Sequence, residues 1–493
     1  MKRTTFLGLT LVFAIALPMF VSCGGSNSST ASPSNLNQSP STPSTTGAVT
    51  ISLSDPATCA APNGSFTHVW VTITKVTANI SSDAGPSDSG WQTVLDLTSG
   101  PKQIDLLSLV STTCVLTQLG STTGLPPGDY QQIRVYLLAN DASGAVPAPN
   151  NCGPMGFNCV ALADGAMVEL QLSSEAQTGI KIPAGQMMGG GLNLMAGQSA
   201  DLNIDFSTCE SIVQEGNGKF RLKPVLHAGE VSLNTNSISG TVINASTKAP
   251  VANAMVMVEQ PDLNGIDRVV ESELTAADGT FIFCPLSPGN YDVVVAASTP
   301  TPVRLPPIGS AATYNATVTF KTPTGASLTI PLVAETQSGM SSSPAELAGT
   351  ITSGGAQAAG VDVSVSTLQQ AAPVGGALVE FTVPAFSGSV SSIETASGPP
   401  CASGTDCANY TLYVPASNPS VGTYSSSGTT YSAPQAGNVP YTVDAQAFLA
   451  DGSNTADCSP SDLDTSFDSG GGALLAIGGA TLTVKTLAFS GCH

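Results

Sequence analysis

The sequence predicts an all-β protein in which tandem β-sandwich domains follow a disordered N-terminal tether. Only 10% of the 493 residues are charged, while 50 are Gly and 35 are Pro, a composition typical of short strands and turns rather than long helices. Apolar and polar residues alternate over 66–80, as in a strand with one buried face. The phrases LPPGDYQQIRV (125–135) and LSPGNYDVVV (286–295) each indicate a Pro-Gly type II turn that opens such a strand.

The first 23 residues have the layout of a secretion signal, with a basic start, an apolar run over 6–20, and a Cys preceded by a small residue. The ending FVSC resembles the lipobox of bacterial lipoproteins. This resemblance implies that residues 1–22 are a lipoprotein signal peptide and that Cys23 carries the lipid. Gly24 is similar to the second residue of lipoproteins sent to the outer membrane. The alternative is an ordinary signal cleaved after Ala16.

Residues 23–46 are predicted to be a disordered tether, because over 24–46 Leu36 is the one large apolar residue and the segment cannot offset its chain entropy. Beyond it no run of about 18 apolar residues predicts a membrane-spanning helix. We expect an exported protein, anchored by lipid at a bacterial outer membrane or cell surface. The net charge of −20 and the lack of a basic cluster argue against nucleic acid as a partner.

Residues 47–233 are predicted to form a β-rich first domain. The strand-like phrases GAVTISLSDP and FTHVWVTITKVTANI are followed by WQTVLDL, KQIDLLSLV and the first Pro-Gly phrase. Their order resembles a family of bacterial surface lipoprotein domains known only as a domain of unknown function, with L-T-D-A-P near its start and L-P-x-G-x-Y later. Ser54 replaces the Thr of the family. The resemblance implies no activity, because the family has none assigned.

Residues 237–335 are predicted to form a second domain with Gly240-Thr241-Val242, Asp278-Gly279-Thr280-Phe281 and the second Pro-Gly phrase as landmarks. This pattern resembles the carboxypeptidase regulatory-like domain, which implies a transthyretin-like β-sandwich from a superfamily that includes carbohydrate-binding modules. The residues agree with a sandwich, because Asp278-Gly279 is a hairpin signal and Phe281 and Phe283 face one side. A carbohydrate ligand is implied by analogy alone.

Residues 345–493 are predicted to form a third β-rich domain. The phrases AELAGTITSG and VDVSVSTL repeat the start of the second domain, and the regulatory pattern then ends. We expect an Ig-like or divergent transthyretin-like sandwich, without a family.

The cysteines predict disulfides. The chain has 11 Cys, and lipid on Cys23 leaves ten to pair. A metal site is the alternative, but there are three His and no C-x-x-C pair, so we expect no metal. The predicted pairs are Cys152 with Cys159, Cys401 with Cys407, and Cys458 with Cys492. The pairing of Cys59, Cys114, Cys209 and Cys284 stays open.

No catalytic pattern is evident. A Ser-His-acid hydrolase needs a histidine inside a pocket, whereas His68 and His227 occupy strand positions and His493 ends the chain. No G-x-S-x-G or H-E-x-x-H motif occurs. We therefore predict a protein that is not an enzyme and has no cofactor. A glycosidase with paired carboxylates remains a remote alternative.

Two groups of residues are candidates for binding. Trp70 shares a strand face with His68 and can be exposed for sugar stacking, whereas packing at a sheet edge is the alternative for Trp70 and Trp91. The acidic segment 451–468 offers ligands for calcium, but it lacks EF-hand spacing and a solvated loop is the simpler reading. Its carboxylates are Asp451, Asp457, Asp462, Asp464 and Asp468.

Together these features predict a non-catalytic surface lipoprotein that binds a glycan or a protein partner. The alternative is a structural spacer of the cell envelope.

Overall fold

The structure is a computed structural model, and parts of the chain are described in it. The described residues are 45–54, 66–82, 84–109, 117–162, 164–173, 175–183, 187, 191–206, 208, 211–214, 219–223, 226–230, 237–262, 264–284, 286, 288–299, 312–334, 344–355, 361–387, 392–398, 401–434, 438–449 and 458–492. The predictions for the signal peptide and for residues 23–44 of the tether lie outside these residues, as do those for Cys23, Cys59, Cys114, Cys209, Asp451, Asp457 and His493.

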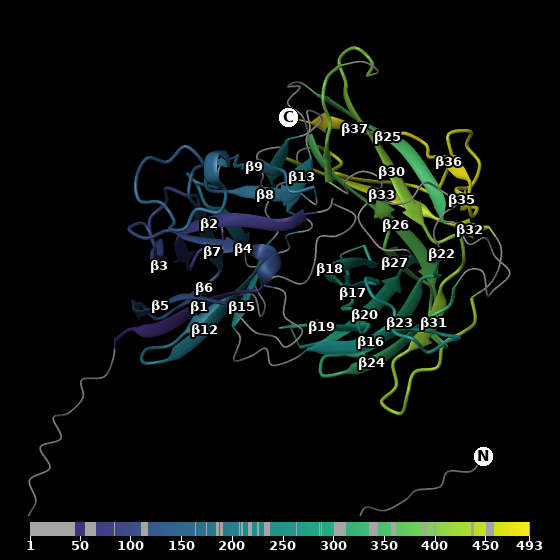
Figure 1. Ribbon diagram of the computed structural model, residues 1–493, viewed down its shortest axis with the longest axis horizontal. Helices are drawn as coiled ribbons and strands as arrows, with labels where there is room; N and C mark the ends of the chain where they lie inside the picture. The colour runs from purple at the N-terminus through teal and green to yellow at the C-terminus, as the bar shows by residue number, and fades with distance from the viewer. Residues whose placement is uncertain are drawn as a thin grey trace, which may run out of the picture. The chain divides into compact units, whose positions relative to one another are not determined.

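The described residues form strands and two short 3-10 helices, so the all-β prediction is confirmed (Figure 1). No helix among them is long and apolar enough to cross a membrane. Contacts within residues 44–493 make this part of the chain one compact unit.

The first domain contains two facing sheets. Its elements are β1 (Gly47–Ser54), β2 (Phe66–Asn79), β3 (Gln92–Asp96), β4 (Lys102–Asp105), η1 (Leu106–Ser108), β5 (Thr117–Leu125), β6 (Gly128–Tyr130), β7 (Gln132–Leu137), η2 (Gly153–Met155), β8 (Cys159–Leu162), β9 (Met167–Gln171), β10 (Ile180–Pro183), β11 (Leu192–Leu194), β12 (Ser199–Phe206), β13 (Ile212–Gln214), β14 (Phe220–Leu222) and β15 (Leu226–Glu230). One sheet has the order β15-β12-β1-β5, with β1 parallel to β12. The other is built around β2.

Strand β2 organises this second sheet because its 14 residues allow pairing with two strands on each edge. It pairs with β4 and β3 on one edge and with β8 and β7 on the other, and β9 extends the sheet beyond β8. Every second side chain near the start of β2 points inward: Val69 and Val71 are fully buried in the core shared by the two sheets. The opposite face of β2 therefore points away from this core.

The second domain is a sandwich of a three-stranded and a four-stranded sheet. Its strands are β16 (Ile238–Asn244), β17 (Met255–Pro261), β18 (Ile266–Leu274), β19 (Thr280–Phe283), β20 (Asn290–Ala296), β21 (Ser298–Thr299), β22 (Ala312–Thr313), β23 (Thr317–Pro323) and β24 (Ser327–Leu332). The order β19-β16-β24 faces β18-β17-β20-β23. Gly279 has φ +77°, and a Cβ there would lie 2.6 Å from the Val242 carbonyl oxygen, so this turn requires glycine. The hairpin prediction is wrong, because β18 pairs with β17 and β19 pairs with β16, and the turn joins the two sheets.

The third domain contains β25 (Ala345–Gly355), β26 (Val361–Ala371), β27 (Val379–Val383), β28 (Phe386–Ser387), β29 (Ser392–Glu394), β30 (Asp406–Val414), β31 (Ser420–Thr423), β32 (Val439–Pro440), β33 (Thr442–Leu449), β34 (Asp462–Thr465), β35 (Leu475–Ala476), β36 (Thr481–Thr483) and β37 (Leu487–Cys492). One of its sheets has the order β28-β30-β25-β36, with β37 also paired to β25. In the other, β26 pairs with β27, β29 and β33.

The second and third domains share a core, which the sequence reading missed. We expected β20 to bury one face, with Tyr291, Val293 and Val295 inward, but Val294 and Ala296 are also fully buried. Val294 and Ala296 belong to a hydrophobic cluster that includes residues of the third domain. In the same cluster the Phe320 and Phe381 rings meet edge to face, with centroids 6.1 Å apart. The sheet itself continues, because β18 pairs with β27 and β23 pairs with β31. A strand that is buried on both faces typically has a continuous run of apolar residues in its sequence.

The Pro-Gly turns also differ from the prediction. Neither Gly128 nor Gly289 has the positive φ that a type II turn requires at its third position. Gly128 instead begins strand β6, which pairs with β11. A Cβ on Gly128 would approach the Ile80 side chain at 3.2 Å, so close packing rather than turn geometry favours glycine there.

Three disulfides have the pairings that the sequence favours: Cys152 with Cys159, Cys401 with Cys407, and Cys458 with Cys492. Each lies within one domain. The third joins residues that are 34 apart in sequence and ties the start of the described C-terminal segment to β37. Cys284 is disulfide-bonded as well.

Candidate functional site

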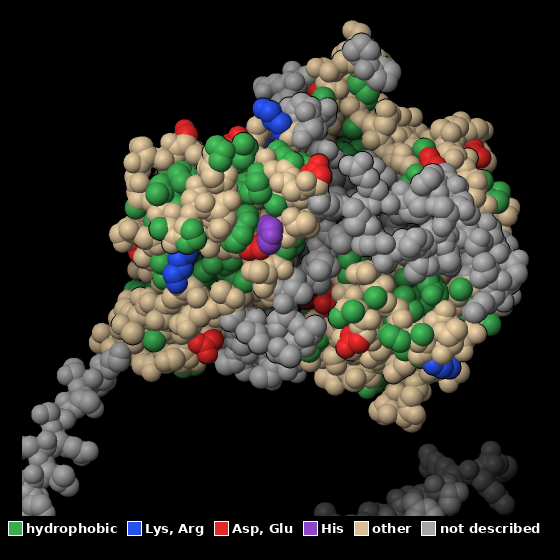
Figure 2. Space-filling model, viewed as in Figure 1, with side chains coloured by type: hydrophobic (Ala, Val, Ile, Leu, Met, Phe, Trp, Pro, Cys, Tyr) green, Lys and Arg blue, Asp and Glu red, His purple; other side chains and the backbone are tan. Residues whose placement is uncertain are grey.

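The outer face of β2 carries His68 and Trp70, as the alternation of the strand predicts. The His68 side chain is 52% exposed and that of Trp70 is half-buried. Figure 2 shows a histidine side chain on the visible surface, next to hydrophobic and acidic side chains. The two rings are stacked, with centroids 5.7 Å apart and an interplanar angle of 24°. The stacked pair stands on the outer face of the sheet, with His68 more exposed than Trp70.

Asp105 fixes the orientation of His68. It ends β4, and its side chain is 8% exposed. One carboxylate oxygen lies 2.6 Å from His68 Nδ1, and the other accepts the Val69 amide at 3.1 Å. A carboxylate in this position favours the tautomer with the proton on Nδ1. In that tautomer Nε2 is a hydrogen-bond acceptor, and no described residue occupies it.

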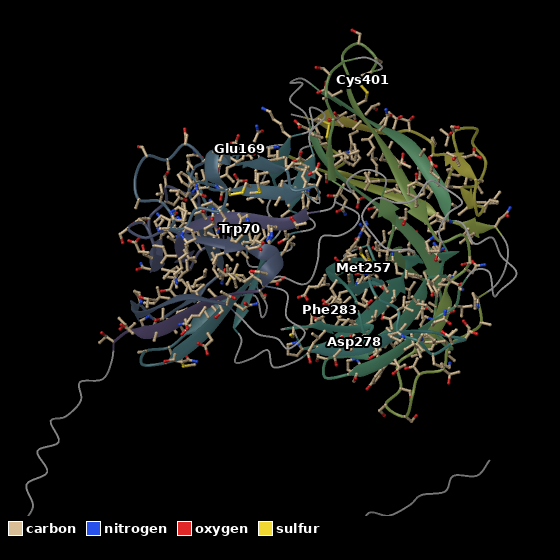
Figure 3. The ribbon with its side chains drawn as sticks, in the orientation of Figure 1. Trp70, Glu169, Met257, Asp278, Phe283 and Cys401 are labelled. Atoms are coloured by element: carbon tan, nitrogen blue, oxygen red, sulfur yellow. A yellow bond between two sulfur atoms is a disulfide. The ribbon has the colours of Figure 1, made fainter. Side chains whose placement is uncertain are left out.

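Strand register places Trp70 in a row of four residues across the sheet. Trp70 is paired with Asp105 on β4 and with Cys159 on β8, and Cys159 is paired with Glu169 on β9. Paired residues point to the same face, so Asp105, Trp70, Cys159 and Glu169 all point away from the core between the sheets. Glu169 is exposed and Trp70 is half-buried, whereas Asp105 and Cys159 are buried. Figure 3 labels Trp70 and Glu169 within this sheet. The buried Cys159 is held by its disulfide to Cys152.

Trp91 has a structural environment instead. Its indole Nε1 donates to the Gly85 carbonyl at 2.8 Å, and the Arg134 guanidinium lies 5.2 Å from the ring centroid. Of the two alternatives for Trp91, sugar stacking and packing at a sheet edge, these contacts fit packing. Trp70, by contrast, has no hydrogen bond from Nε1 to any described residue, and its ring contacts His68.

The geometry of this face does not suit the chemistry of hydrolases. A nucleophile would have to hydrogen-bond to His68 Nε2, and among the described residues none does. Asp105 and Glu169 are separated by three strand spacings, about 14 Å between backbones. Paired glycosidase carboxylates lie roughly 5 to 9.5 Å apart. In addition, the described part of the chain has no cluster of three or more His, Cys, Asp or Glu residues that suits a metal ion.

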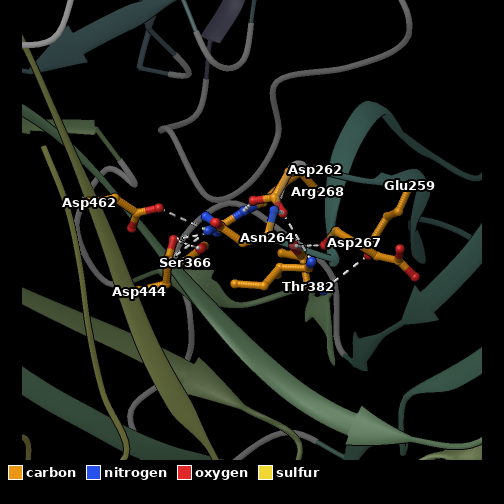
Figure 4. A network of polar contacts seen from close by, with 10 residues as sticks. Glu259, Asp262, Asn264, Asp267, Arg268, Ser366, Thr382, Asp444 and Asp462 are labelled. Atoms are coloured by element: carbon orange, nitrogen blue, oxygen red, sulfur yellow. Dashed lines mark hydrogen bonds and ion pairs between the residues drawn. The ribbon is translucent and has the colours of Figure 1, made fainter. Parts of the chain in front are cut away.

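A second polar cluster lies where the second and third domains meet (Figure 4). Arg268 on β18 forms a two-pronged ion pair with Asp444 on β33, at 2.6 and 3.1 Å. It also contacts Asp262 at 3.2 Å and Asp462 at 3.3 Å. Asp444 is only 3% exposed. These contacts hold two domains together, so the cluster is structural.

Beside this cluster, Glu259 on β17 is fully buried and one of its carboxyl oxygens accepts the Thr382 amide at 3.0 Å. Burial raises the pKa of Glu259 well above its usual range, and the nearby Asp267 and Asp292 raise it further, against the Thr382 hydrogen bond. Burial also raises the pKa of Asp267. Sequence reasoning missed these groups. For Asp267, the sequence pattern that could have indicated a buried charge is the run IDRVVESEL (266–274), in which charged residues interrupt an apolar strand.

The acidic segment proposed for calcium is divided among different roles. Asp462 pairs with Arg268. Asp468 accepts amide hydrogen bonds from Gly470 and Gly472 at 2.8 and 2.9 Å, which closes a local turn. Asp464 is exposed on β34. The described carboxylates of this segment therefore do not converge.

Comparisons with solved structures give distant likenesses. The Bacillus anthracis TIE protein has 9% identity and a TM-score of 0.14; the match covers 90% of this chain and 51% of that protein, so the chain spans about half of its length. Shaft pilin SpaA from Lactobacillus rhamnosus GG has 9% identity and a TM-score of 0.17, over 59% of this chain and 98% of the pilin. The minor pilin GBS52 of Streptococcus agalactiae has 8% identity and a TM-score of 0.17, over 52% and 97%. Likenesses at this level carry no argument about function.

No curated protein matches the chain in sequence. The family models do match. Residues 46–224 match the family described as a domain of unknown function, DUF4382. Residues 237–323 match the family described as the carboxypeptidase regulatory-like domain. The two matches follow each other along the chain in the order that the sequence motifs predict.

Proposed function

We propose that this protein is a non-catalytic, lipid-anchored surface protein that binds a glycan or a protein partner through its first domain. The observation that carries the proposal is the outer face of β2. There Asp105 holds His68 stacked on Trp70, and neither His68 Nε2 nor Trp70 Nε1 has a partner among the described residues. Binding sites commonly combine aromatic surface with a few fixed polar groups.

Export and anchoring have separate support. The three disulfides fit an oxidising compartment outside the cytosol. The FVSC ending at Cys23 and the Ser-, Pro- and Thr-rich segment after it fit a lipid anchor and a spacer. The outer membrane or the cell surface is the proposed location.

A structural spacer is the second candidate, and one observation favours it. The shared core of the second and third domains makes a continuous hydrophobic cluster from Met255 to Cys492. Such a body is suited to holding another domain away from a membrane. The two roles are compatible if the first domain binds and the other two support it.

A glycan array separates binding from a pure spacer role. The full chain is applied in a zwitterionic detergent, because detergents with sugar headgroups compete for the site. Saturable binding to a defined set of glycans, or in a parallel screen to a protein of the same envelope, supports the proposal. Silence in both screens, with a folded protein by circular dichroism, leaves the spacer.

A further inference from the structure

We infer that the outer face of the β4-β2-β8-β9 sheet is a binding site for a neutral oligosaccharide, with Trp70 as its stacking surface. The inference rests on the proposed function and assigns it to particular residues. It is carried by the ring pair, by the hydrogen-bonding groups beside it, and by the charge of the face.

The ring pair offers the right surface for a pyranose. His68 and Trp70 follow each other at a strand spacing of two, so both rings stand on one face, and their planes differ by only 24°. Because the two rings are stacked, His68 covers one face of Trp70, and the C–H face of a sugar ring can pack on the other face of the indole. Trp combines an apolar ring with an N–H at its rim, and Trp70 Nε1 has no partner among the described residues. A sugar oxygen can therefore accept a hydrogen bond from it.

Two further groups can meet the hydroxyls of the sugar. His68 Nε2 accepts a hydrogen bond in the tautomer that Asp105 favours. The exposed Glu169 uses one carboxylate oxygen for Asn140, at 3.0 Å, and the other has no partner in the described part of the chain. Trp70 and Glu169 are two strand spacings apart, about 10 Å. That span suits more than one linked sugar unit.

The negative charge of this face favours neutral glycans over anionic ones. Asp105 and Glu169 are in the same row as Trp70, and the chain as a whole has a net charge of −20. Like charges repel anionic ligands from such a surface. Uronic acid polymers and sulfated glycans are therefore disfavoured, and neutral sugars are not.

A protein partner fits this face less well. Protein interfaces have an apolar core of large side chains. The exposed large hydrophobic residues of the described chain are Ile80, Val146, Met195, Val374, Leu378, Phe467 and Ile477. None of them lies on β4, β8 or β9 or on the start of β2. A small polar ligand that stacks on one aromatic surface is the better match.

The site is also rigid before a ligand arrives. The Asp105 carboxylate fixes the His68 ring, and the Cys152–Cys159 disulfide holds the strand beside Trp70. Preorganised groups lose little conformational freedom on binding. A shallow site can bind a flexible sugar with useful affinity only under that condition.

Fluorescence titration tests the inference, because the chain has only two Trp residues. The full chain in zwitterionic detergent is titrated with cellohexaose, maltohexaose and, as the anionic probe, a hexamer of galacturonic acid. Trp91→Phe serves as the matched control, since it leaves Trp70 as the only tryptophan signal. We expect saturable binding of at least one neutral hexamer, detected through Trp70, and none of the anionic hexamer. Trp70→Ala and His68→Ala are measured by calorimetry.

We expect Trp70→Ala to weaken binding of the neutral hexamer at least tenfold and Trp91→Phe to change it less than twofold. Circular dichroism of each variant shows whether it is folded. Unchanged affinity in a folded Trp70→Ala variant overturns the inference, as does a wild type that binds neither neutral hexamer. If the wild type fails here but binds other glycans or a protein in the screens above, the site assignment is wrong and the proposed function stands. If it binds nothing at all, both are wrong.

Discussion

Glu273→Gln should change how the stability of this protein depends on pH. Glu273 lies on β18, its side chain is buried with 9% of the residue exposed, and one of its oxygens accepts the Ile282 amide. It forms no ion pair with any described residue. Burial raises its pKa to about 8, against the lowering effect of the Ile282 hydrogen bond. In the unfolded chain the pKa of a Glu is about 4.3.

The sign of the effect follows from proton binding. Between about 4.3 and about 8 the folded protein binds the proton and the unfolded chain does not, so the free energy of unfolding falls as pH rises. The slope is about 1.4 kcal/mol per pH unit. Over this window the loss amounts to roughly 5 kcal/mol, of which about 4 kcal/mol has occurred by pH 7. Gln keeps the acceptor oxygen and cannot ionise, so the variant should not show this loss.

The assay is urea unfolding at several pH values from 4 to 8, followed by circular dichroism. The difference in unfolding free energy between Glu273→Gln and wild type should be small at pH 4 and should grow in favour of the variant towards pH 8. Asp278→Asn on the next turn is the matched control. Hydrogen bonds from Thr280 lower the pKa of the exposed Asp278, so its replacement should act with the opposite sign. Parallel curves for wild type and Glu273→Gln would refute the reasoning.

Three other predictions concern the Arg268–Asp444 ion pair, the Cys458–Cys492 disulfide and the lipid anchor. Arg268→Ala leaves Asp444 buried without its cation, and should lower the free energy of unfolding by about 3 to 5 kcal/mol. Replacing Cys458 and Cys492 by Ala opens a loop of 34 residues and should cost on the order of 4 kcal/mol. Both are measured by urea unfolding. Cys23→Ala should move the protein from the detergent phase to the aqueous phase in phase partitioning.

Each of these three predictions has an outcome that would contradict it. An Arg268→Ala variant as stable as wild type would show that the two domains do not depend on this ion pair. Free thiols at Cys458 and Cys492 in exported protein would contradict the pairing. A Cys23→Ala variant that stays in the detergent phase would show that lipid on this residue is not the anchor.

The sequence predicted what depends on local pattern. The alternation of β2 placed Val69 and Val71 inside and His68 and Trp70 outside. Loop-bracketing cysteines indicated two short disulfides, because the geometry of a short loop is local. The turn at Asp278-Gly279 was predictable for the same reason, since positive φ requires glycine there. That it joins two sheets rather than two paired strands was not.

The contacts that could not be predicted from the sequence join residues that are far apart in the chain. Asp105 is 37 residues from His68, and only the pairing of β4 with β2 brings them together. Arg268 and Asp444 are 176 residues apart. The shared core of two domains was visible as the apolar run Val293–Ala297, but a run of this kind fits one strand buried on both faces as well as other structures. Only the packing of the third domain decides between them.

The proposed ligand site of the first domain is centred on Trp70. The most direct test is calorimetry of wild type and Trp70→Ala against the glycan that gives the strongest signal on the array, with both proteins at full length. We expect Trp70→Ala to lose at least tenfold in affinity while its thermal unfolding temperature stays within a few degrees of wild type. Equal affinity of the two folded proteins would contradict it.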